Sequence, residues 1–245
     1  MLIFTGTANR DLSEKVAKHL GLSLANAEIS RFADGECRVI IKENVRRQDC
    51  YIIQPTGPSI YGSPNDNFME LLLMIDALKR GSANSVNAVI PYYGYERQDR
   101  KDYSRAPISA RVIATCLESL GVNRVITFDL HAGQIQGFFP SLLPVDNLYS
   151  ESYFIKYILT HMEKNSISTN DIMIVSPDEG GYKRAVRVAN KINCGVVVLH
   201  KERSGPNQVG KMVIMGEVRN KLCFMVDDMI DTGGTACRAA NLVSE

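Results

Sequence analysis

Two adjacent carboxylates, Asp227 and Asp228, end an apolar segment and precede a loop rich in threonine and glycine in residues 222–235 (LCFMVDDMIDTGGT). Successive strand residues face opposite sides of a sheet, and an apolar sheet cannot bury both carboxylates unpaired, so we expect both at the carboxyl end of a strand. Parallel α/β sheets bind their ligands at this edge. The carboxylates suit ribose hydroxyls, directly or through a metal ion. The alternative is an ordinary Asp-rich turn between a strand and a helix.

The loop that follows has the residue types of a phosphate site. Gly233 and Gly234 allow the backbone to turn its N–H groups onto a phosphate, and Thr232 and Thr235 add hydroxyl donors. The helix expected to begin here adds the partial positive charge of its N-terminus. Because the acids and the glycine loop occur together at a strand end, binding is favoured over a plain turn.

A second strand end, in residues 172–181 (IMIVSPDEGG), also pairs acids with consecutive glycines: Asp178, Glu179, Gly180 and Gly181. The helix expected over 182–192 carries Lys183, Arg184 and Arg187. This pattern predicts a second phosphate cradle, although it also fits a simple tight turn. Two such loops in one domain indicate a ligand that is phosphorylated at two places.

Two further segments combine charge with loop-forming residues. Residues 92–105 (YYGYERQDRKDYSR) place arginines, among them Arg97, between tyrosines, so that guanidinium groups can hold phosphate while an aromatic ring stacks on a base; a solvated charged loop is the alternative. Residues 200–209 project Lys201 and Arg203 and suit a lid that closes over a phosphorylated ligand, or a long solvated hairpin. Residues 205–211 fit G-x-x-x-x-G-K, but Met212 replaces the Ser or Thr that a P-loop needs and a strand is expected to follow.

His131 follows another apolar segment, in DLHAGQIQGFF. At the carboxyl end of a strand, a histidine can ligate a metal or transfer a proton. A purely structural histidine is the alternative, and the position of His131 favours the functional interpretation. The other three histidines have contexts that suggest no chemistry.

The elements that position these residues alternate between apolar, β-branched segments and segments of helical period. This alternation predicts an α/β fold with parallel sheets joined by crossover helices. Helices are expected to begin near Asp11, with Glu14 completing a capping box, and behind Asn65 and Asp66, and another to end ahead of Gly121. A proline-rich stretch near Pro144 separates two sets of β/α units, which predicts domains over 1–143 and 144–245. The expected strands cover residues 2–5, 51–54, 86–91, 124–129, 172–176, 195–200 and 222–227.

Composition narrows the function further. The 245 residues carry 28 Lys and Arg against 27 Asp and Glu, a net charge of 28 − 27 = +1, with 45% hydrophobic residues. This balance argues against disorder and gives no general reason to bind nucleic acid or an anionic membrane, so a small-molecule partner is expected. The longest apolar run, residues 71–75, is far too short to span a bilayer. Six cysteines without a C-x-x-C pair indicate reduced thiols in a cytoplasmic protein.

Together these segments resemble the ribose-phosphate pyrophosphokinases of the Mg-dependent, phosphate-activated class. The resemblance covers nearly the whole chain and rests on RFADGE (31–36), NDNFMELLLMIDALKR (65–80), RQDRKDYSRAPISA (97–110), DLHAGQIQGFF (129–139), SPDEGG (176–181) and VDDMIDTGGT (226–235). It implies two phosphoribosyltransferase-like (Rossmann-like) domains, the second truncated. It also implies transfer of the pyrophosphoryl group of ATP to ribose 5-phosphate, giving phosphoribosyl pyrophosphate (PRPP) and AMP with Mg²⁺.

The resemblance also implies residue roles. Asp227 and Asp228 would meet the ribose hydroxyls, and the pyrophosphate would lie at Asp178, Glu179, Gly180 and Gly181. Lys201, Arg203 and His131 would be catalytic, with His131 and Asp178 near the metal. The 5-phosphate would be held by Asp231, Thr232, Gly233, Gly234 and Thr235. ATP would be bound by Arg97, Gln98 and Asp102, and by Phe32, Asp34 and Glu36 of a neighbouring subunit. The family further implies a hexamer built from dimers, with phosphate and ADP as effectors at Arg46, Ser82 and Arg105.

Two departures from the family pattern and two other functions are to be weighed. Residues 56–64 (TGPSIYGSP) are a few residues longer than is usual, and the second sheet is short of strands, so we expect Glu245 to mark a truncation or another segment to complete the sheet. A phosphoribosyltransferase that consumes PRPP would explain 226–235 but not the N-terminal half. A non-catalytic regulatory homologue is favoured by the short end and disfavoured by the intact Lys201, Arg203, His131 and Asp178. The enzyme hypothesis requires the anion-binding turns of both halves to meet in one cleft.

Overall fold

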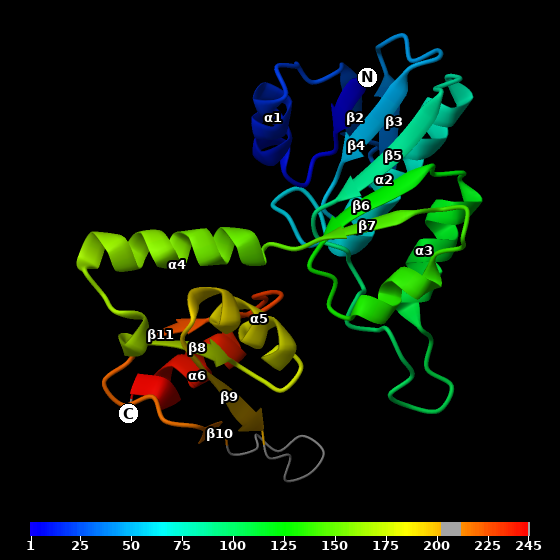
Figure 1. The fold of residues 1–245 in the computed structure, drawn as a ribbon. Helices are drawn as coiled ribbons and strands as arrows, with labels where there is room; N and C mark the ends of the chain where they lie inside the picture. Colours follow the sequence, from blue (N-terminus) through cyan, green and yellow to red (C-terminus); the bar gives the residue numbers. More distant parts are fainter. Residues whose placement is uncertain (202–211, 245) are drawn as a thin grey trace. The chain divides into compact units, whose positions relative to one another are not determined.

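The computed structural model describes residues 1–201 and 212–244, without the side chain of Lys201, and divides into two compact units, Met1–Leu148 and Tyr149–Glu245 (Figure 1). The predicted boundary at Pro144 lies before a strand that the structure assigns to the first unit, because β7 (Val145–Leu148) pairs with β6 (Arg124–Phe128). No described helix is long and apolar enough to cross a membrane.

The first unit is built on a five-stranded parallel sheet in the order β1-β4-β5-β6-β7. Its other strands are β1 (Leu2–Thr5), β4 (Asp49–Ile53) and β5 (Ser85–Ile90). Alternate residues enter opposite cores: Phe4 and Ile52 belong to the main cluster, whereas Ile3 and Ile53 pack with α1 (Arg10–His19). Both faces of the sheet are therefore covered, as a parallel sheet requires.

Helices and one hairpin cover this sheet. The main cluster takes its helical residues from α2 (Pro64–Arg80) and α3 (Ser109–Ser119). The antiparallel hairpin of β2 (Ala27–Arg31) and β3 (Cys37–Ile41), which packs on α2, was not expected from the sequence. A short 3₁₀ helix, η1 (Gly133–Phe138), follows β6.

The starts of two helices differ from the predicted ones. The prediction of a capping box formed by Asp11 and Glu14 is wrong. Asn9 is the N-cap of α1, and its side chain accepts from the N–H of Leu12. An Asn side chain two residues earlier accepts from an otherwise unpaired N–H of the first turn, so the helix begins sooner. In α2 the capping box is formed by Ser63 and Asp66.

The second unit has a four-stranded sheet in the order β10-β9-β8-β11. The parallel strands are β8 (Ile172–Ser176), β9 (Gly195–Lys201) and β11 (Leu222–Met225), and β10 (Met212–Met215) is antiparallel to β9. Helices α4 (Glu151–Asn165) and α5 (Tyr182–Ile192) pack on one face and α6 (Gly234–Ser244) on the other. A 3₁₀ turn, η2 (Thr169–Asp171), precedes β8. The expected α/β fold with parallel sheets is confirmed in both units.

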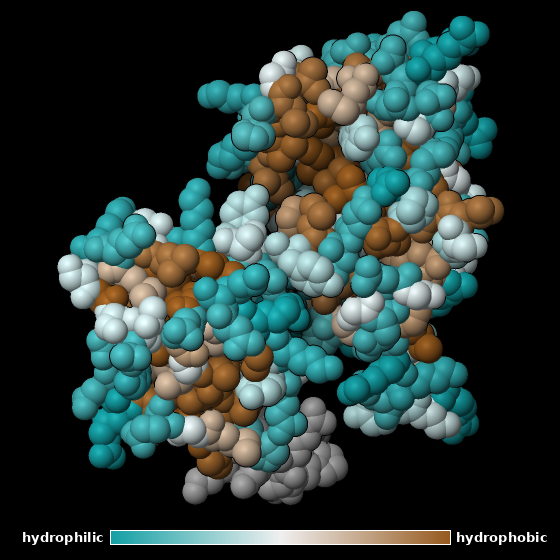
Figure 2. Space-filling model, in the orientation of Figure 1, coloured by the Kyte–Doolittle hydropathy of each residue, from teal (hydrophilic) through white to brown (hydrophobic). Residues whose placement is uncertain are grey.

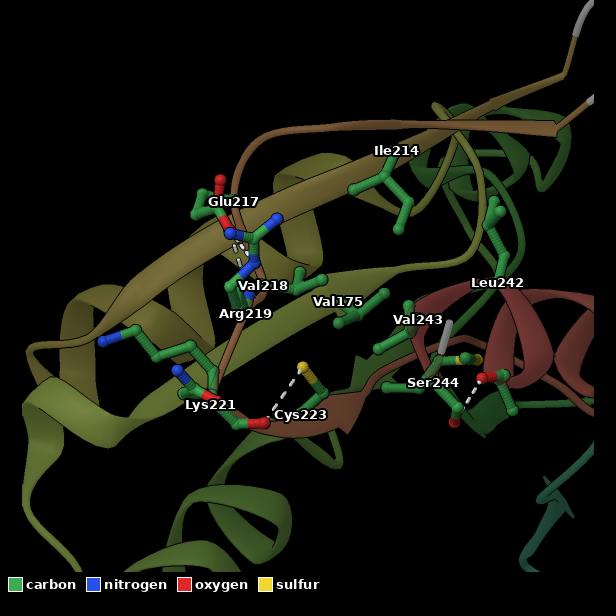
Figure 3. A pocket seen from close by; sticks show the side chains of 13 residues that line it. Val175, Ile214, Glu217, Val218, Arg219, Lys221, Cys223, Leu242, Val243 and Ser244 are labelled. Atoms are coloured by element: carbon green, nitrogen blue, oxygen red, sulfur yellow. Dashed lines mark hydrogen bonds and ion pairs between the residues drawn. The ribbon is translucent and has the colours of Figure 1, made fainter.

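The face under α6 is incompletely covered. A pocket of about 740 Å³ lies there, lined by apolar side chains such as Val175, Ile214 and Leu242 (Figure 3). Apolar atoms also reach the surface where β10 lies (Figure 2), since Val213 and Met215 are exposed. None of the residues predicted to bind substrate lines this pocket.

Candidate functional site

Two turns of the second unit meet at Gly181. Strands β8 and β11 are parallel neighbours, so the turns that follow them lie at the same edge of the sheet. A Cβ atom at Gly181 would lie 3.8 Å from Asp178 Oδ1 and 3.9 Å from Asp227 Oδ1. It would also lie 2.8 Å from Ser176 Oγ, so the position has no room for a side chain. The structure thus brings together two of the predicted site carboxylates, which are 49 residues apart in sequence (227 − 178).

The first turn is held by its own side chains. Ser176 Oγ donates to the carbonyl oxygen of Asp178 at 2.7 Å, and the N–H of Gly181 donates to Asp178 Oδ1 at 3.1 Å. The Glu179 carboxylate is hydrogen-bonded to His200 Nδ1 of β9. The sequence had indicated no chemistry for His200, because its place in a strand hid its contact with the neighbouring turn.

Asp227 and Asp228 lie just beyond β11, which ends two residues earlier than predicted. The N–H of Asp228 donates to Asp227 Oδ1 at 2.9 Å. Burial raises the pKa of Asp227 to about 6, helped by hydrogen bonding to Asp228 and by the charges of Asp228 and Asp178. A carboxyl group in this environment is a poor anion unless a cation is nearby.

Arg184 is a member of this cluster that sequence reasoning did not place in the site. It lies in the first turn of α5, and its Nη1 is 3.9 Å from Asp228 Oδ1, with 12% and 10% of the two side chains exposed. The signal in the sequence was a basic residue three positions after Gly181, which directs it back toward the turn. The buried cation balances part of the negative charge of the cluster.

The loop from Asp231 to Thr235 opens α6. Gly233 has φ +75°, which favours glycine, and its carbonyl oxygen accepts from the N–H of Cys237 at 2.8 Å. Asp231 and Thr232 are exposed, and the helix starts at Gly234. The start of an 11-residue helix with hydroxyl groups beside it is a suitable anion site.

His131 lies in the first unit, immediately after β6. Its side chain is exposed, and its backbone N–H donates to Glu96 Oε2 at 2.9 Å. Glu96 is 4% exposed and precedes Arg97 in the loop after β5. No residue pattern singled out Glu96, because it stands in a charged segment that was interpreted as solvated or as binding phosphate.

The loop after β5 carries Arg97, Gln98 and Asp102, which were predicted to bind ATP. Gln98 Oε1 accepts from Ser109 Oγ at 2.6 Å at the start of α3, and Asp102 pairs with Arg100 at 3.0 Å. Arg97 and Gln98 are exposed. These contacts hold the loop after β5 at the carboxyl edge of the sheet.

The turn of the β2–β3 hairpin carries Phe32, Asp34 and Glu36. It is closed by hydrogen bonds from the N–H of Phe32 to the Glu36 carbonyl oxygen (2.8 Å) and from the N–H of Glu36 to Asp34 Oδ1 (3.1 Å). The phenyl ring of Phe32 is 53% exposed. An exposed aromatic ring at a hairpin tip suits contact with a partner molecule.

Of the predicted effector residues, Arg46 and Ser82 lie on loops that touch. The N–H of Arg47 donates to the Ser82 carbonyl oxygen at 3.0 Å. Ser82 and Arg105 have φ values of +64° and +66°.

Lys201 ends β9, and Arg203, with the glycine loop at 205–211, lies outside the described residues.

The carboxylates at Gly181 fit a magnesium ion. Neighbouring carboxylates repel a phosphate unless a cation lies between them, and Mg²⁺ is commonly held by one or two carboxylates together with substrate phosphates. Among residues 1–201 and 212–244, no three His, Cys, Asp or Glu side chains form a metal site by themselves.

Adjacent polar turns at the carboxyl edge of parallel strands place the second unit among the α/β proteins that bind their ligands at this edge. The phosphoribosyl transferase domain model matches residues 146–245, and the N-terminal domain of ribose phosphate pyrophosphokinase matches residues 1–121. The chain belongs to the ribose-phosphate pyrophosphokinase family.

The individual relatives agree. The chain is 46% identical to ribose-phosphate pyrophosphokinase A of Dictyostelium discoideum over 242 residues, covering 98% of this chain and 73% of the relative. It is 47% identical to the Thermotoga maritima ribose-phosphate pyrophosphokinase, covering 98% and 73%. The crystal structure of phosphoribosylpyrophosphate synthetase from Mycobacterium smegmatis matches with a TM-score of 0.87 and 38% identity, covering 99% of this chain and 76% of that one. The chain thus spans about three quarters of the length of these relatives.

Proposed function

We propose that the chain is a ribose-phosphate diphosphokinase that transfers the pyrophosphoryl group of ATP to the C1 hydroxyl of ribose 5-phosphate. The hydroxyl oxygen forms a bond to the β-phosphorus, the bond from that phosphorus to the oxygen bridging the α-phosphate breaks, and AMP leaves. The hydroxyl proton passes to a base or to water. The products, PRPP and AMP, serve nucleotide biosynthesis.

The observation that carries this proposal is the approach of Asp178 and Asp227 to Gly181. One turn carries Asp178 and two glycines for the pyrophosphate, and the other carries Asp227 and Asp228 for the ribose hydroxyls. The 5-phosphate lies at Asp231, Thr232, Gly233, Gly234 and Thr235. Because one sheet edge carries both turns, a single ligand phosphorylated at two places can occupy them together.

The remaining residues bind ATP and neutralise charge. Arg97, Gln98 and Asp102 hold the nucleotide, and the hairpin residues Phe32, Asp34 and Glu36 meet its adenine and ribose from a neighbouring subunit. By the family resemblance, Asp178 and His131 are the residues that would contact Mg²⁺, and the ion would neutralise charge on the phosphates. Lys201 and Arg203 stabilise the negative charge of the reacting phosphate. Charge stabilisation of this kind is the main requirement of phosphoryl transfer.

Assembly and regulation follow the same proposal. The chain acts in the cytoplasm as a hexamer built from dimers, and phosphate and ADP bind at Arg46, Ser82 and Arg105. The contact between the Arg47 and Ser82 loops supports a shared effector site for two of these residues.

The deciding experiment is a coupled assay of the purified chain with ATP, ribose 5-phosphate, Mg²⁺ and phosphate. We expect equal amounts of AMP and PRPP. Consumption of PRPP with a nucleobase would instead indicate a phosphoribosyltransferase. Nucleotide binding without turnover would indicate a regulatory homologue, and either outcome would contradict the proposal.

A further inference from the structure

A buried carboxylate in the loop after β5 contacts the turn that carries His131. Glu96 is 4% exposed, and its Oε2 accepts a hydrogen bond of 2.9 Å from the backbone N–H of His131, 35 residues away in sequence. Burying a carboxylate is costly unless it is hydrogen-bonded. The next two residues after Glu96 are Arg97 and Gln98, which we place at the ATP.

The backbone of the His131 turn is specified at three successive N–H groups. The N–H of Asp129 donates to the Leu148 carbonyl oxygen at 2.8 Å, that of Leu130 to Asn147 Oδ1 at 3.2 Å, and that of His131 to Glu96. Asp129 has φ +44°, a left-handed conformation that needs support from its surroundings. These three hydrogen bonds therefore fix the backbone that carries the His131 side chain.

A second contact joins the same two loops. Gln134 Nε2 donates to Asp99 Oδ2 at 2.9 Å. Asp99 lies three residues after Glu96, and Gln134 lies three residues after His131. Glu96 and Asp99, two acidic residues of the loop after β5, therefore hold the His131 turn at its start and where it continues into η1.

We propose that Glu96 is a positioning residue for His131: its carboxylate fixes the backbone of the turn and couples it to the loop that binds ATP through Arg97 and Gln98. This inference rests on the proposed roles of His131 and Arg97. Nothing in it requires Glu96 to touch substrate.

The first test measures the hydrogen bond itself. In the full chain, we expect Glu96→Ala to speed amide hydrogen exchange in residues 129–138 at least tenfold, because the His131 N–H loses its acceptor. Glu96→Gln retains a carbonyl acceptor and should restore most of the protection. Glu118→Ala, an exposed carboxylate of α3, serves as the matched control and should change nothing. Unchanged exchange in Glu96→Ala would overturn the proposal.

The second test measures catalysis. We expect Glu96→Ala to lower kcat at least tenfold while the KM for ribose 5-phosphate stays within about twofold, and Glu96→Gln to recover most of the rate. In a His131→Ala background, Glu96→Ala should change kcat less than twofold, because the two residues act through one another. An equal loss in both backgrounds would overturn the proposal.

The two tests separate this inference from the proposed function. If His131→Ala alone keeps full kcat, the proposed role of His131 is wrong, and positioning of a catalytic His131 by Glu96 is overturned with it, whatever the exchange data show. If Glu96→Ala does not fold, Asp99→Ala removes the second contact without opening the buried site. Faster exchange in residues 131–138 with lowered kcat would then support the coupling of the two loops, and no change would overturn it.

Discussion

Asp227 and Asp228 are neighbours in sequence but have different surroundings. Asp228 lies 3.9 Å from the buried Arg184, whereas Asp227 faces Asp228 and the charge of Asp178, and burial raises its pKa to about 6. The surroundings of Asp227 therefore favour its neutral form up to a higher pH than is usual for an aspartate. A perturbed pKa of this kind is a common feature of binding sites for charged ligands.

This difference predicts a pH dependence of stability. Between about pH 4 and pH 6 the folded chain holds the Asp227 proton more tightly than the unfolded chain, so the free energy of unfolding falls as the pH rises through this window. Asp227→Asn cannot ionise, so the variant should not lose stability through this titration. With Mg²⁺ chelated, the Tm of the variant minus that of the unmodified chain should be larger at pH 7 than at pH 4.

Thermal melts of both proteins at the two pH values check this expectation. The exposed Asp171→Asn serves as a control and should leave the difference constant. A Tm difference for Asp227→Asn that is the same at pH 4 and pH 7 would show that Asp227 is not perturbed by its surroundings.

Also at the residue scale, Lys201→Ala should lower kcat more than a hundredfold and leave ATP affinity within a few-fold. The physical reason is loss of the cation that we propose acts at the reacting phosphate, which is worth ~3–4 kcal/mol of transition-state stabilisation in a dry site. Steady-state kinetics and ATP titration measure the two quantities. Near-normal turnover would remove Lys201 from the mechanism.

At the scale of elements, the start of α2 is specified by a short local motif. Ser63 accepts from the N–H of Asp66, the Asp66 carboxylate accepts from the N–H of Ser63, and Pro64 occupies the first turn. Further along, Glu70 of the same helix accepts from the backbone N–H of Thr7 at 2.6 Å and from Gln54 Nε2 at 2.9 Å. The helix therefore also holds the loops that follow β1 and β4.

We expect Ser63→Ala to lower the free energy of unfolding by about 1 kcal/mol, the usual cost of a lost N-cap. Urea unfolding followed by circular dichroism measures it. The control Ser119→Ala removes an exposed serine at the end of α3 and should change stability by less than about 0.5 kcal/mol. Equal effects of both substitutions would argue against the cap.

At the scale of the whole molecule, the proposed sharing of the nucleotide between subunits can be tested by complementation. Phe32→Ala removes the ring offered to the neighbour's ATP, and His131→Ala disables the chain's own site. Each variant alone should be nearly inactive. In a random 1:1 mixed assembly, roughly a quarter of the sites combine an intact His131 with an intact neighbouring Phe32, since closed symmetric oligomers repeat the same contact.

Co-expression of the two variants followed by PRPP assay measures the recovered activity. We expect about a quarter of the unmodified specific activity. Mixed assemblies that stay as inactive as either variant alone would show that Phe32 does not serve a neighbouring subunit.

Much of the architecture followed from residue type and spacing. Apolar, β-branched segments predicted strands such as Leu2–Thr5 and Ile172–Ser176 with the observed bounds, and helix α5 was predicted over its full length. The hairpin that carries Phe32 was missed, because its two strands are half-buried and lack a clean alternation. The start of α1 was misplaced because Asn9 competes with Asp11 for the same cap.

The amino-acid order alone predicted most of the strands and helices and the turns that we propose to bind phosphate, because hydropathy, periodicity and turn preference are local properties of the chain. Only the tertiary structure decided that Asp178 and Asp227 share Gly181, that Arg184 reaches Asp228, and that Glu96 holds His131. The physical reason is that the first two contacts depend on β8 and β11 being neighbours, and the third on β5 and β6 being neighbours. Strand order is set by packing of the complete sheet and has no local signature in the sequence.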